Sequence, residues 1–304
     1  MKKGVSLETI EKWGVFEHRV IGDDETTTDM EASAAMNALD MAGIAPEAID
    51  LIISCTAVSR QVGIPNANAL QNKIGAANAA GFDVTMACGS AIPSILVAAQ
   101  FIAAGLYRYA LVTGSSDATT VADPTDPPSF VVLGDGAGAM VVGSGKDERS
   151  GILSFDMQSK GEYFDYCGFK VKKPKISAAD SQERLYFYIK ELEDSYSEFR
   201  DYLIESVPNS VNISLSRAGI TVDNIDFYIA HQNINTISGM WVKKLGIPPE
   251  KTHLTYHKYG NMTSANIFVN LDEALQANRI KKGDIVLFAG QGAGFSVGSI
   301  VMKW

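Results

Sequence analysis

The sequence has few cysteines, no long apolar run and no excess of positive charge, and each absence narrows the class of protein. Three cysteines in 304 residues, without close spacing, argue against a disulfide framework and against a zinc site, and fit a reducing cytoplasm. No run of 18 apolar residues predicts a membrane-spanning helix, and residues 1–14 have no apolar core typical of a signal peptide. The net charge of −9 makes nucleic acid and anionic membranes poor candidates as partners. We therefore expect a cytoplasmic globular protein.

The sequence also resembles itself at a fixed distance. Residues 42–53 read AGIAPEAIDLII, and residues 218–229, 176 positions further along, read AGITVDNIDFYI. The same shift places ALVTG over VLFAG and MAC over MTS. Three ungapped matches at one offset predict two copies of one supersecondary unit.

Each copy predicts the same order of elements. A helix (28–42 and 197–218) ends at a glycine and precedes a short apolar strand, and an almost uniformly apolar helix precedes a second strand. Apolar strands that alternate with helices indicate α/β sheets covered on both faces. We expect layers in the order α/β/α/β/α around buried central helices, with one half in residues 1–150 and the other in residues 151–304.

One predicted strand has no counterpart. Residues 151–155 (GILSF) open the second copy as a strand, and the same offset places their equivalent before residue 1. Two explanations stay open: the first half lacks an edge strand, or the chain starts late.

Cys88 is a candidate nucleophile. It lies between a strand-like segment, residues 82–85, and the start of an apolar helix, in DVTMACGSAIPS. A thiol at a helix N-terminus is close to unpaired N–H groups and to the positive end of the helix dipole, which favour the thiolate. An inert buried cysteine fits the same context, so both interpretations stay open. Cys55 and Cys167 are interpreted as structural.

His231 and Asn261 are the candidate polar groups of the second half. His231 follows an apolar strand directly, at the carboxyl end where ligands and catalytic groups collect in α/β sheets, although a structural histidine would also fit. Asn261 lies in the loop that corresponds to the Cys88 loop, where its amide could donate to a carbonyl oxygen, although Gly-Asn is also a turn signal. Packing about a pseudo-two-fold axis would make Cys88 and Asn261 face one another.

Two glycine-rich segments resemble nucleotide-binding motifs but lack essential parts. Residues 290–294 follow a strand, yet no helix comes after them, which excludes a dinucleotide fingerprint. The segment LGDGAGAM lacks the Lys-Ser/Thr pair of a P-loop. We interpret both as tight turns that line a site, where a backbone N–H could bind an oxyanion.

Five segments, taken together and in order, resemble the thiolase-fold condensing enzymes, in particular the β-ketoacyl-acyl-carrier-protein synthase III (KAS III) group. They are DVTMACGSA, LGDGAGAMVVG, AHQN, YGNMTSANIFVNLDEAL and GQGAGFSVGSIVMKW. The resemblance covers essentially the whole chain. It implies a duplicated, five-layered thiolase-like α/β fold with two mixed sheets, and an obligate homodimer.

The resemblance also implies a two-step acyl transfer in fatty acid or secondary-metabolite synthesis. Cys88 would take the acyl group from a coenzyme A or acyl-carrier-protein (ACP) thioester. His231 and Asn261 would then stabilise the enolate formed when a malonyl thioester loses CO2. The N–H of Cys88 and one near Ala293 would bind the first oxyanion, and no cofactor or metal is implied. The site-lining loop comprises Gln291, Gly292, Ala293 and Gly294.

Several substrate-binding positions follow from the same resemblance. Ile64 aligns with the residue that caps the acyl cavity of the partner subunit, so it is expected to influence chain length. Gln232 belongs to the motif at His231, and Asn235 follows Ile234, which occupies the usual place of the motif's last asparagine.

Other positions depart from the family pattern. Glu8 and Lys12 stand where primer-dependent members hold coenzyme A with Trp and Arg, and lysine cannot make the bidentate contacts of arginine. Gln291 replaces a phenylalanine and is expected to bring a polar group near the reacting thioester. These departures indicate a divergent member.

The same residues allow three alternatives to decarboxylative condensation. The acyl group on Cys88 could pass to another nucleophile without loss of CO2, or the chain could be a catalytically silent partner subunit. A Cys-His-Asn hydrolase is disfavoured because the apolar helix behind Cys88 predicts an occluded tunnel that excludes water.

Overall fold

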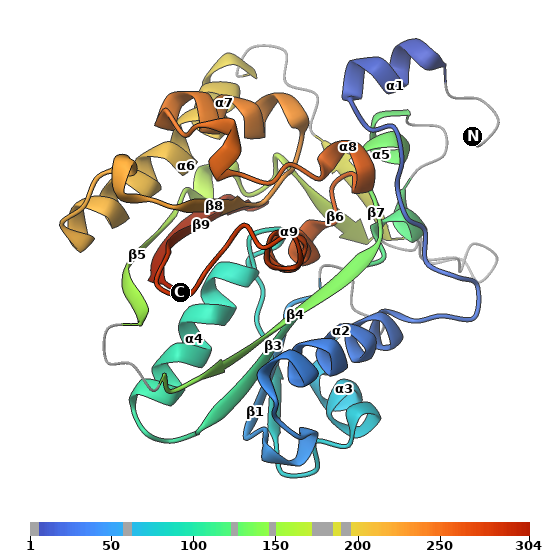
Figure 1. Ribbon diagram of the computed structural model, residues 1–304. Helices are drawn as coiled ribbons and strands as arrows, with labels where there is room; N and C mark the ends of the chain where they lie inside the picture. Colours follow the sequence, from blue (N-terminus) through green and yellow to red (C-terminus); the bar gives the residue numbers. More distant parts are fainter. Residues whose placement is uncertain (1–5, 57–62, 123–126, 146–149, 172–184, 190–195) are drawn as a thin grey trace.

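The protein is described by a computed structural model that covers residues 6–56, 63–122, 127–145, 150–171, 185–189 and 196–304 (Figure 1). The described helices are α1 (Leu7–Trp13), α2 (Thr27–Ala42), α3 (Asn66–Ile74), α4 (Ala91–Ala103), α5 (Pro127–Val132), α6 (Tyr196–Ala218), α7 (Asn235–Leu245), α8 (Tyr256–Tyr259) and α9 (Asn266–Gln276). The described strands are β1 (Leu51–Ser54), β2 (Ala80–Asp83), β3 (Tyr109–Ser116), β4 (Gly136–Gly143), β5 (Gly151–Ser159), β6 (Cys167–Val171), β7 (Leu185–Ile189), β8 (Phe227–Ala230), β9 (Ile285–Gly292) and β10 (Ser296–Lys303). None of the described helices is both long enough and apolar enough to span a bilayer.

Two mixed sheets form the framework. The first has the order β2-β1-β3-β4, in which β1 is parallel to β2 and β3 while β4 is antiparallel to β3. The second has the order β5-β10-β9-β8, in which β8 is parallel to β9 while β10 is antiparallel to both of its neighbours. A separate antiparallel ribbon joins β6 and β7. The predicted α/β class with two mixed sheets is confirmed.

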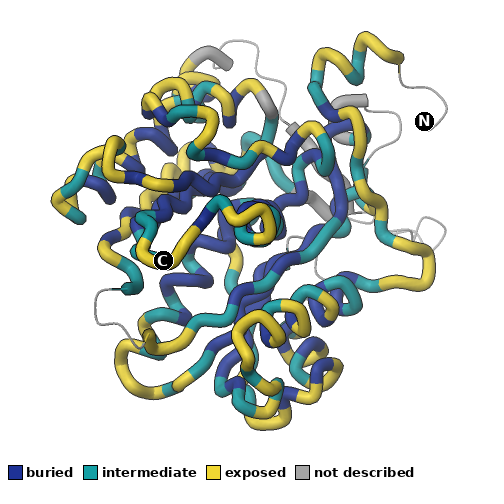
Figure 2. The backbone as a smooth tube through the Cα atoms, in the orientation of Figure 1, coloured by how far each residue is buried: buried dark blue, intermediate teal, exposed yellow. Residues whose placement is uncertain are grey.

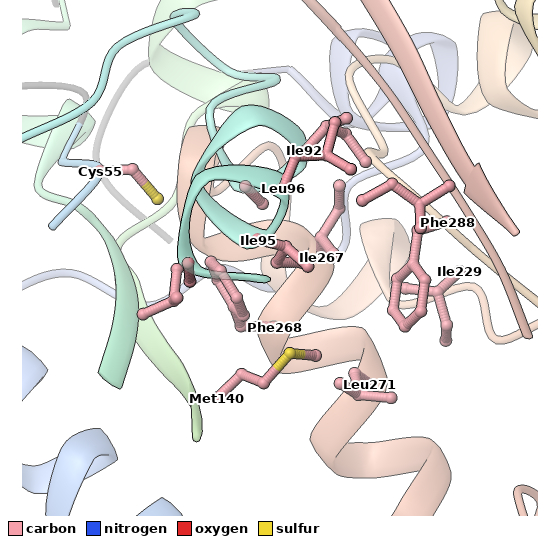
Figure 3. Packing of buried hydrophobic residues seen from close by; sticks show 14 of the residues in the cluster. Cys55, Ile92, Ile95, Leu96, Met140, Ile229, Ile267, Phe268, Leu271 and Phe288 are labelled. Atoms are coloured by element: carbon pink, nitrogen blue, oxygen red, sulfur yellow. The ribbon is translucent and has the colours of Figure 1, made fainter. Parts of the chain in front are cut away.

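The layers follow from where the apolar side chains lie. Helices α4 and α9 fill the space between the sheets, and buried residues of β1, β3, β8 and β9 pack against them (Figures 1 and 3). Helices α2 and α3 cover the outer face of the first sheet, and α6 and α7 cover that of the second. Buried backbone is concentrated in this central zone (Figure 2). The central layer explains why the α4 segment is apolar nearly all round, since it faces a sheet on each side.

The backbone repeats at the predicted offset. The bounds of β1 and β8 differ by 176 positions, as do those of β3 and β9. Gly43 and Gly219 end the preceding helices, α2 and α6, with φ values of 66° and 69°. The strands of the first sheet all precede residue 150, and those of the second sheet all follow it.

The edges of the two sheets differ at one place. In the second sheet β5 pairs along the outer edge of β10, whereas the corresponding edge of β4 carries no strand within the described part of the chain. A cavity of about 660 Å³ lies beside β4, between α2 and α9. Within the described residues, the first sheet thus has no strand at the place that β5 occupies in the second sheet.

The segment LGDGAGAM is mostly a strand and not the turn that its glycines suggested. Only Gly134 and Asp135 form the connection, and β4 begins at Gly136. A Cβ on Gly138 would lie 2.5 Å from the Cβ of Phe268, and glycine therefore lets α9 pack directly on the strand. In the same way Gly290 and Gly292 belong to β9, and the turn that follows contains Ala293 and Gly294.

Candidate active site

The Cys88 turn is a tight structure that joins β2 to α4. Ala87 has the left-handed φ of 48°, which reverses the chain just before the cysteine. The hydroxyl of Ser90 accepts from the N–H of Met86 at 2.7 Å and donates to the carbonyl of Ala87 at 2.5 Å. The turn is thereby closed on itself, with Cys88 half-buried at its tip.

The glycine loop at the end of β9 lies directly against this turn. A Cβ on Gly292 would lie 1.8 Å from the carbonyl oxygen of Met86, and one on Gly89 would lie 3.2 Å from the nitrogen of Gly292. Only glycine permits such an approach of two backbones. The glycine loop at the end of β9 therefore lies against the turn that carries Cys88.

His231 is held at the carboxyl end of β8 by its backbone. Its N–H donates to the carbonyl of Ala289 in β9 at 2.9 Å, and the side chain is buried. Burial lowers the pKa of His231 to about 3, and a hydrogen bond to the backbone of Thr263 opposes this shift. The imidazole is therefore neutral near pH 7 and carries a single ring N–H. Its Nδ1 has no hydrogen-bond partner among the described residues.

Asn261 is oriented by contacts on both sides. Its backbone N–H donates to the carbonyl of Val132 at 2.6 Å, and its carbonyl accepts from the N–H of Gly134 at 3.1 Å. Its side-chain Oδ1 accepts from the N–H of Thr263 at 2.8 Å, which leaves the amide Nδ2 as the group that can donate. Thr263 thus contacts both Asn261 and His231.

A continuous set of contacts links the three predicted catalytic residues. The Cys88 turn touches the end of β9, the backbone of His231 is bonded to β9, and Thr263 bridges His231 to Asn261. The sequence prediction that the Cys88 and Asn261 loops belong to one site is consistent with this arrangement. Among the described residues, no group of three or more His, Cys, Asp or Glu side chains is placed to hold a metal ion.

The surroundings of Cys88 do not favour the thiolate. Burial raises the pKa of the Cys88 thiol to about 11, and a backbone hydrogen bond only partly offsets this effect. The loss of water around the sulfur therefore raises the pKa of the thiol by more than the helix N-terminus lowers it. The resting pair of Cys88 and His231 is a neutral thiol and a neutral imidazole.

The two predicted glutamines use their side chains to brace the protein. Gln232 accepts from the N–H groups of Thr255 and Tyr256, both at 2.9 Å, and donates to the carbonyl of His253 at 2.7 Å. Gln291 donates to the hydroxyl of Ser206 in α6 at 2.8 Å. Because alternate residues of a strand face opposite ways, Gly290 and Gly292 face the Cys88 turn while Gln291 faces α6. The side chain of Gln291 therefore points away from the position predicted for it beside the thioester.

The other residues that were predicted to bind substrate lie at the surface of the protein or outside the described residues. Lys12 is exposed on α1, with its Nζ 5.7 Å from the centre of the Trp13 ring. Ile64 projects from the turn before α3 with 56% of its surface exposed. The side chain of Asn235 lies outside the described residues.

One buried polar residue was missed in the sequence. Glu31 is fully buried on the inner face of α2, although its spacing from the buried Ala35 and Leu39 marks it as facing the sheet. A helical-periodicity count would have shown a charged residue on an otherwise small and apolar face.

Comparison with known proteins agrees with this geometry. Residues 82–161 match the family described as 3-oxoacyl-[acyl-carrier-protein (ACP)] synthase III, and residues 215–304 match the family described as its C-terminal region. The β-ketoacyl-[acyl-carrier-protein] synthase III of Listeria welshimeri is 34% identical over 98% of this chain and 91% of its own length.

Solved structures give the same result. The crystal structure of 3-oxoacyl-[acyl-carrier-protein] synthase III from Aquifex aeolicus is 29% identical over 99% of this chain and 92% of that one, with a TM-score of 0.86. The priming β-ketosynthase of the R1128 polyketide biosynthetic pathway is 26% identical over 98% and 88%, with a TM-score of 0.89. The sequence matches, the thiolase-like fold and the site geometry together show that this chain belongs to the β-ketoacyl-acyl-carrier-protein synthase III family.

Proposed function

We propose that the protein is a condensing acyltransferase in which Cys88 carries the acyl group and His231 and Asn261 assist the second step. The observation that carries this proposal is the contact between the Cys88 turn and the β9 glycine loop. This contact brings the end of β9 against the turn that carries Cys88, and backbone N–H groups of these two segments could bind an oxyanion formed at the thioester.

In the first step the Cys88 sulfur attacks the carbonyl carbon of an acyl thioester on coenzyme A or ACP. The thiol loses its proton as the new S–C bond forms, and the departing carrier thiolate takes up a proton, so the step is neutral overall. The N–H groups of Cys88 and Ala293 are our candidates for binding the tetrahedral oxyanion.

In the second step a malonyl thioester loses CO2, and the electron pair of the broken C–C bond becomes an enolate. The ring N–H of His231 and the amide of Asn261 donate to the enolate oxygen. Both groups are uncharged, which suits a negative charge that develops only on the way to the transition state. The enolate carbon then attacks the acyl-enzyme, and Cys88 leaves as the thiolate and is reprotonated.

We extend the proposal to the assembly and the compartment. The first sheet ends at β2, an edge strand whose Asp83 anchors the start of α3 beside Ile64. A second copy that pairs along this edge would place Ile64 near the partner's acyl cavity, which supports a homodimer. All three cysteines are free, as a cytoplasmic protein requires.

The test is intact-protein mass spectrometry after incubation with acyl thioesters on coenzyme A and on ACP. We expect a mass gain equal to one acyl group, its loss in Cys88→Ala, and release of CO2 once a malonyl thioester is added. Acyl transfer without CO2 release would favour the alternative of another acceptor. No adduct from any donor would favour the silent subunit and contradict the proposal. Light scattering of the purified protein tests the homodimer.

A further inference from the structure

Glu31 is a fully buried carboxyl group that the proposed reaction does not use. It lies on the face of α2 that packs against the first sheet, in a row with the buried Ala35 and Leu39. A carboxylate in such a place is costly unless hydrogen-bond donors surround it. The hydrogen-bond partners of Glu31 therefore show which segments of the protein it holds together.

Four donors from three other elements meet this carboxyl group. Oε1 accepts from the hydroxyl groups of Ser115 at 2.6 Å and Ser54 at 3.1 Å. Oε2 accepts from Asn66 Nδ2 at 2.8 Å and from the hydroxyl of Thr113 at 3.1 Å. Ser54 ends β1, Thr113 and Ser115 belong to β3, and Asn66 is the first residue of α3. The carboxyl group thus joins α2 to the sheet and to α3.

Three further contacts hold Asn66 and Ala67 at the start of α3. The Oδ1 of Asn66 accepts from the hydroxyl of Thr28 at 2.8 Å, which comes from the same helix as Glu31. Its backbone N–H donates to Asp83 at 2.7 Å, and the next N–H, that of Ala67, donates to the same carboxylate at 3.0 Å. Pro65, the N-cap of α3, has no side chain that could satisfy these N–H groups. The start of α3 therefore depends on Glu31 and Asp83 for its position.

Ile64 is connected to Asn66 by a single rigid residue. Pro65 lies between them with φ of −61°, a torsion that its ring holds nearly fixed. Ile64 itself exposes 56% of its surface and is one of the exposed large apolar side chains of the molecule. A shift of Asn66 is therefore passed on to the direction in which Ile64 projects.

We propose that Glu31 is a positioning residue for acyl-chain selection, because through Asn66 it fixes the Ile64–Pro65 turn that closes the acyl cavity of a partner subunit. The inference rests on the proposed function, which assigns Ile64 to that cavity. The inference goes beyond the proposed function because it names a residue in α2 that sets the depth of the acyl cavity.

The ionisation of Glu31 adds a second measurable property, a dependence of acyl selection on pH. The pKa of Glu31 is raised to about 7, because burial and the nearby Asp83 raise it by more than the hydroxyl groups of Ser115, Ser54 and Thr113 lower it. Cys55 is the other titratable group that faces the carboxyl group, and its pKa is raised well above the usual range, so it stays a thiol. Ionised Glu31 accepts the stronger hydrogen bond from Asn66. The turn is therefore held more firmly at pH 8 than at pH 6.

The experiment compares the loading of Cys88 by acetyl and decanoyl coenzyme A in the wild type and in five variants. Asn66→Ala, Glu31→Ala and Ile64→Ala should change the ratio of the two loading rates in the same direction, by about tenfold or more. Glu31→Gln, which keeps one acceptor oxygen, should restore most of the wild-type ratio but lose its dependence on pH between 6 and 8. Ser115→Ala is the matched control, because it removes a donor to Oε1, whereas Asn66 donates to Oε2. Its ratio should stay within about twofold of the wild type.

The outcomes separate the two proposals. A wild type that forms no Cys88-dependent adduct overturns the proposed function. A wild type that loads normally, with an unchanged ratio in Asn66→Ala or in Ile64→Ala, overturns the role of Glu31. If Glu31→Ala does not fold, the ratio in Asn66→Ala and the pH response of Glu31→Gln decide the question in the same way.

Discussion

The turn that carries Cys88 and the turn that carries Ser264 occupy equivalent places in the two halves, 176 positions apart, and each contains a left-handed residue at the same position. The residue before each has a left-handed φ, 48° at Ala87 and 45° at Thr263. Their side chains differ in availability. Cys88 is half-buried at the tip of its turn, whereas Ser264 is buried and donates to the carbonyl of Ser115 at 2.8 Å. The same turn therefore presents a reactive group in one half and ties two segments together in the other.

In a second equivalent pair, the side chain that is available for chemistry belongs to the second half of the chain instead of the first. The N–H groups of Cys55 and His231 both donate at 2.9 Å to the carbonyls of equivalent residues, Thr113 and Ala289. The thiol of Cys55 donates back to Thr113 at 2.9 Å and is fully buried, whereas the Nδ1 of His231 has no partner among the described residues. The duplicated backbone thus supplies two equivalent sites. A side chain remains free for chemistry only where its hydrogen bonds are not already used.

The largest expected effect comes from removing the available member of the first pair. Cys88→Ala should abolish the acyl adduct and lower turnover by roughly 10⁴-fold or more, because no other group can carry the acyl chain. Ser264→Ala is the matched variant and should cost about 1–2 kcal/mol of stability while it still loads. Intact mass and thermal unfolding measure the two effects. Equal loss of acyl loading in Cys88→Ala and Ser264→Ala would contradict the assignment of a reactive role to Cys88 and a structural role to Ser264.

Removing His231 or Asn261 should impair one step only. His231→Ala and Asn261→Ala should each lower the condensation rate by about 10²–10³-fold, because each removes one donor to the enolate oxygen, while acyl loading is largely retained. Loading by single-turnover mass spectrometry and condensation by CO2 release separate the steps. His257→Ala, at an exposed histidine of the same region, is the control. Equal losses in both steps would show that the roles are misassigned.

The neutral Cys88 and His231 predict the pH dependence of loading. The pKa of Cys88 is raised to about 11, so the thiolate fraction and the loading rate should rise about a hundredfold from pH 7 to pH 9, without a plateau. His231, with a pKa lowered to about 3, should contribute no inflection between pH 5 and pH 9. Rapid-quench loading with a stable acyl thioester measures the profile. A plateau near pH 6 would indicate a thiolate–imidazolium pair instead.

The smallest effect tests the close approach of the two halves. Gly292→Ala forces a Cβ within 1.8 Å of the Met86 carbonyl and should cost about 1–3 kcal/mol of stability, together with slower loading. Gly239→Ala in α7 meets nothing within 4 Å and should stabilise the protein by about 0.4–1 kcal/mol. Chemical denaturation and loading rates compare the pair. A Gly292→Ala protein with unchanged stability and loading would mean that the contact is not maintained in solution.

The framework could be predicted because its signals are local and repeated. The predicted helix at 28–42 corresponds to α2 at Thr27–Ala42, and the repeated apolar segment VLFAG lies within β9. The strand β4 was interpreted as a turn, because its glycines have low strand propensity. They are tolerated where α9 lies against the strand, and that contact comes from residues more than a hundred positions away.

By itself the sequence determined the duplication, the α/β class and the candidate set of Cys88, His231 and Asn261. The physical reason is that helix and strand periodicity, and the residue types at strand ends, are properties of short segments. Only the tertiary structure decided that burial raises the pKa of Cys88, that Gln291 faces α6, and that the buried Glu31 of α2 accepts a hydrogen bond from the start of α3. Desolvation and hydrogen bonding depend on which distant segments exclude water from a group. Those neighbours exist only once the chain has folded.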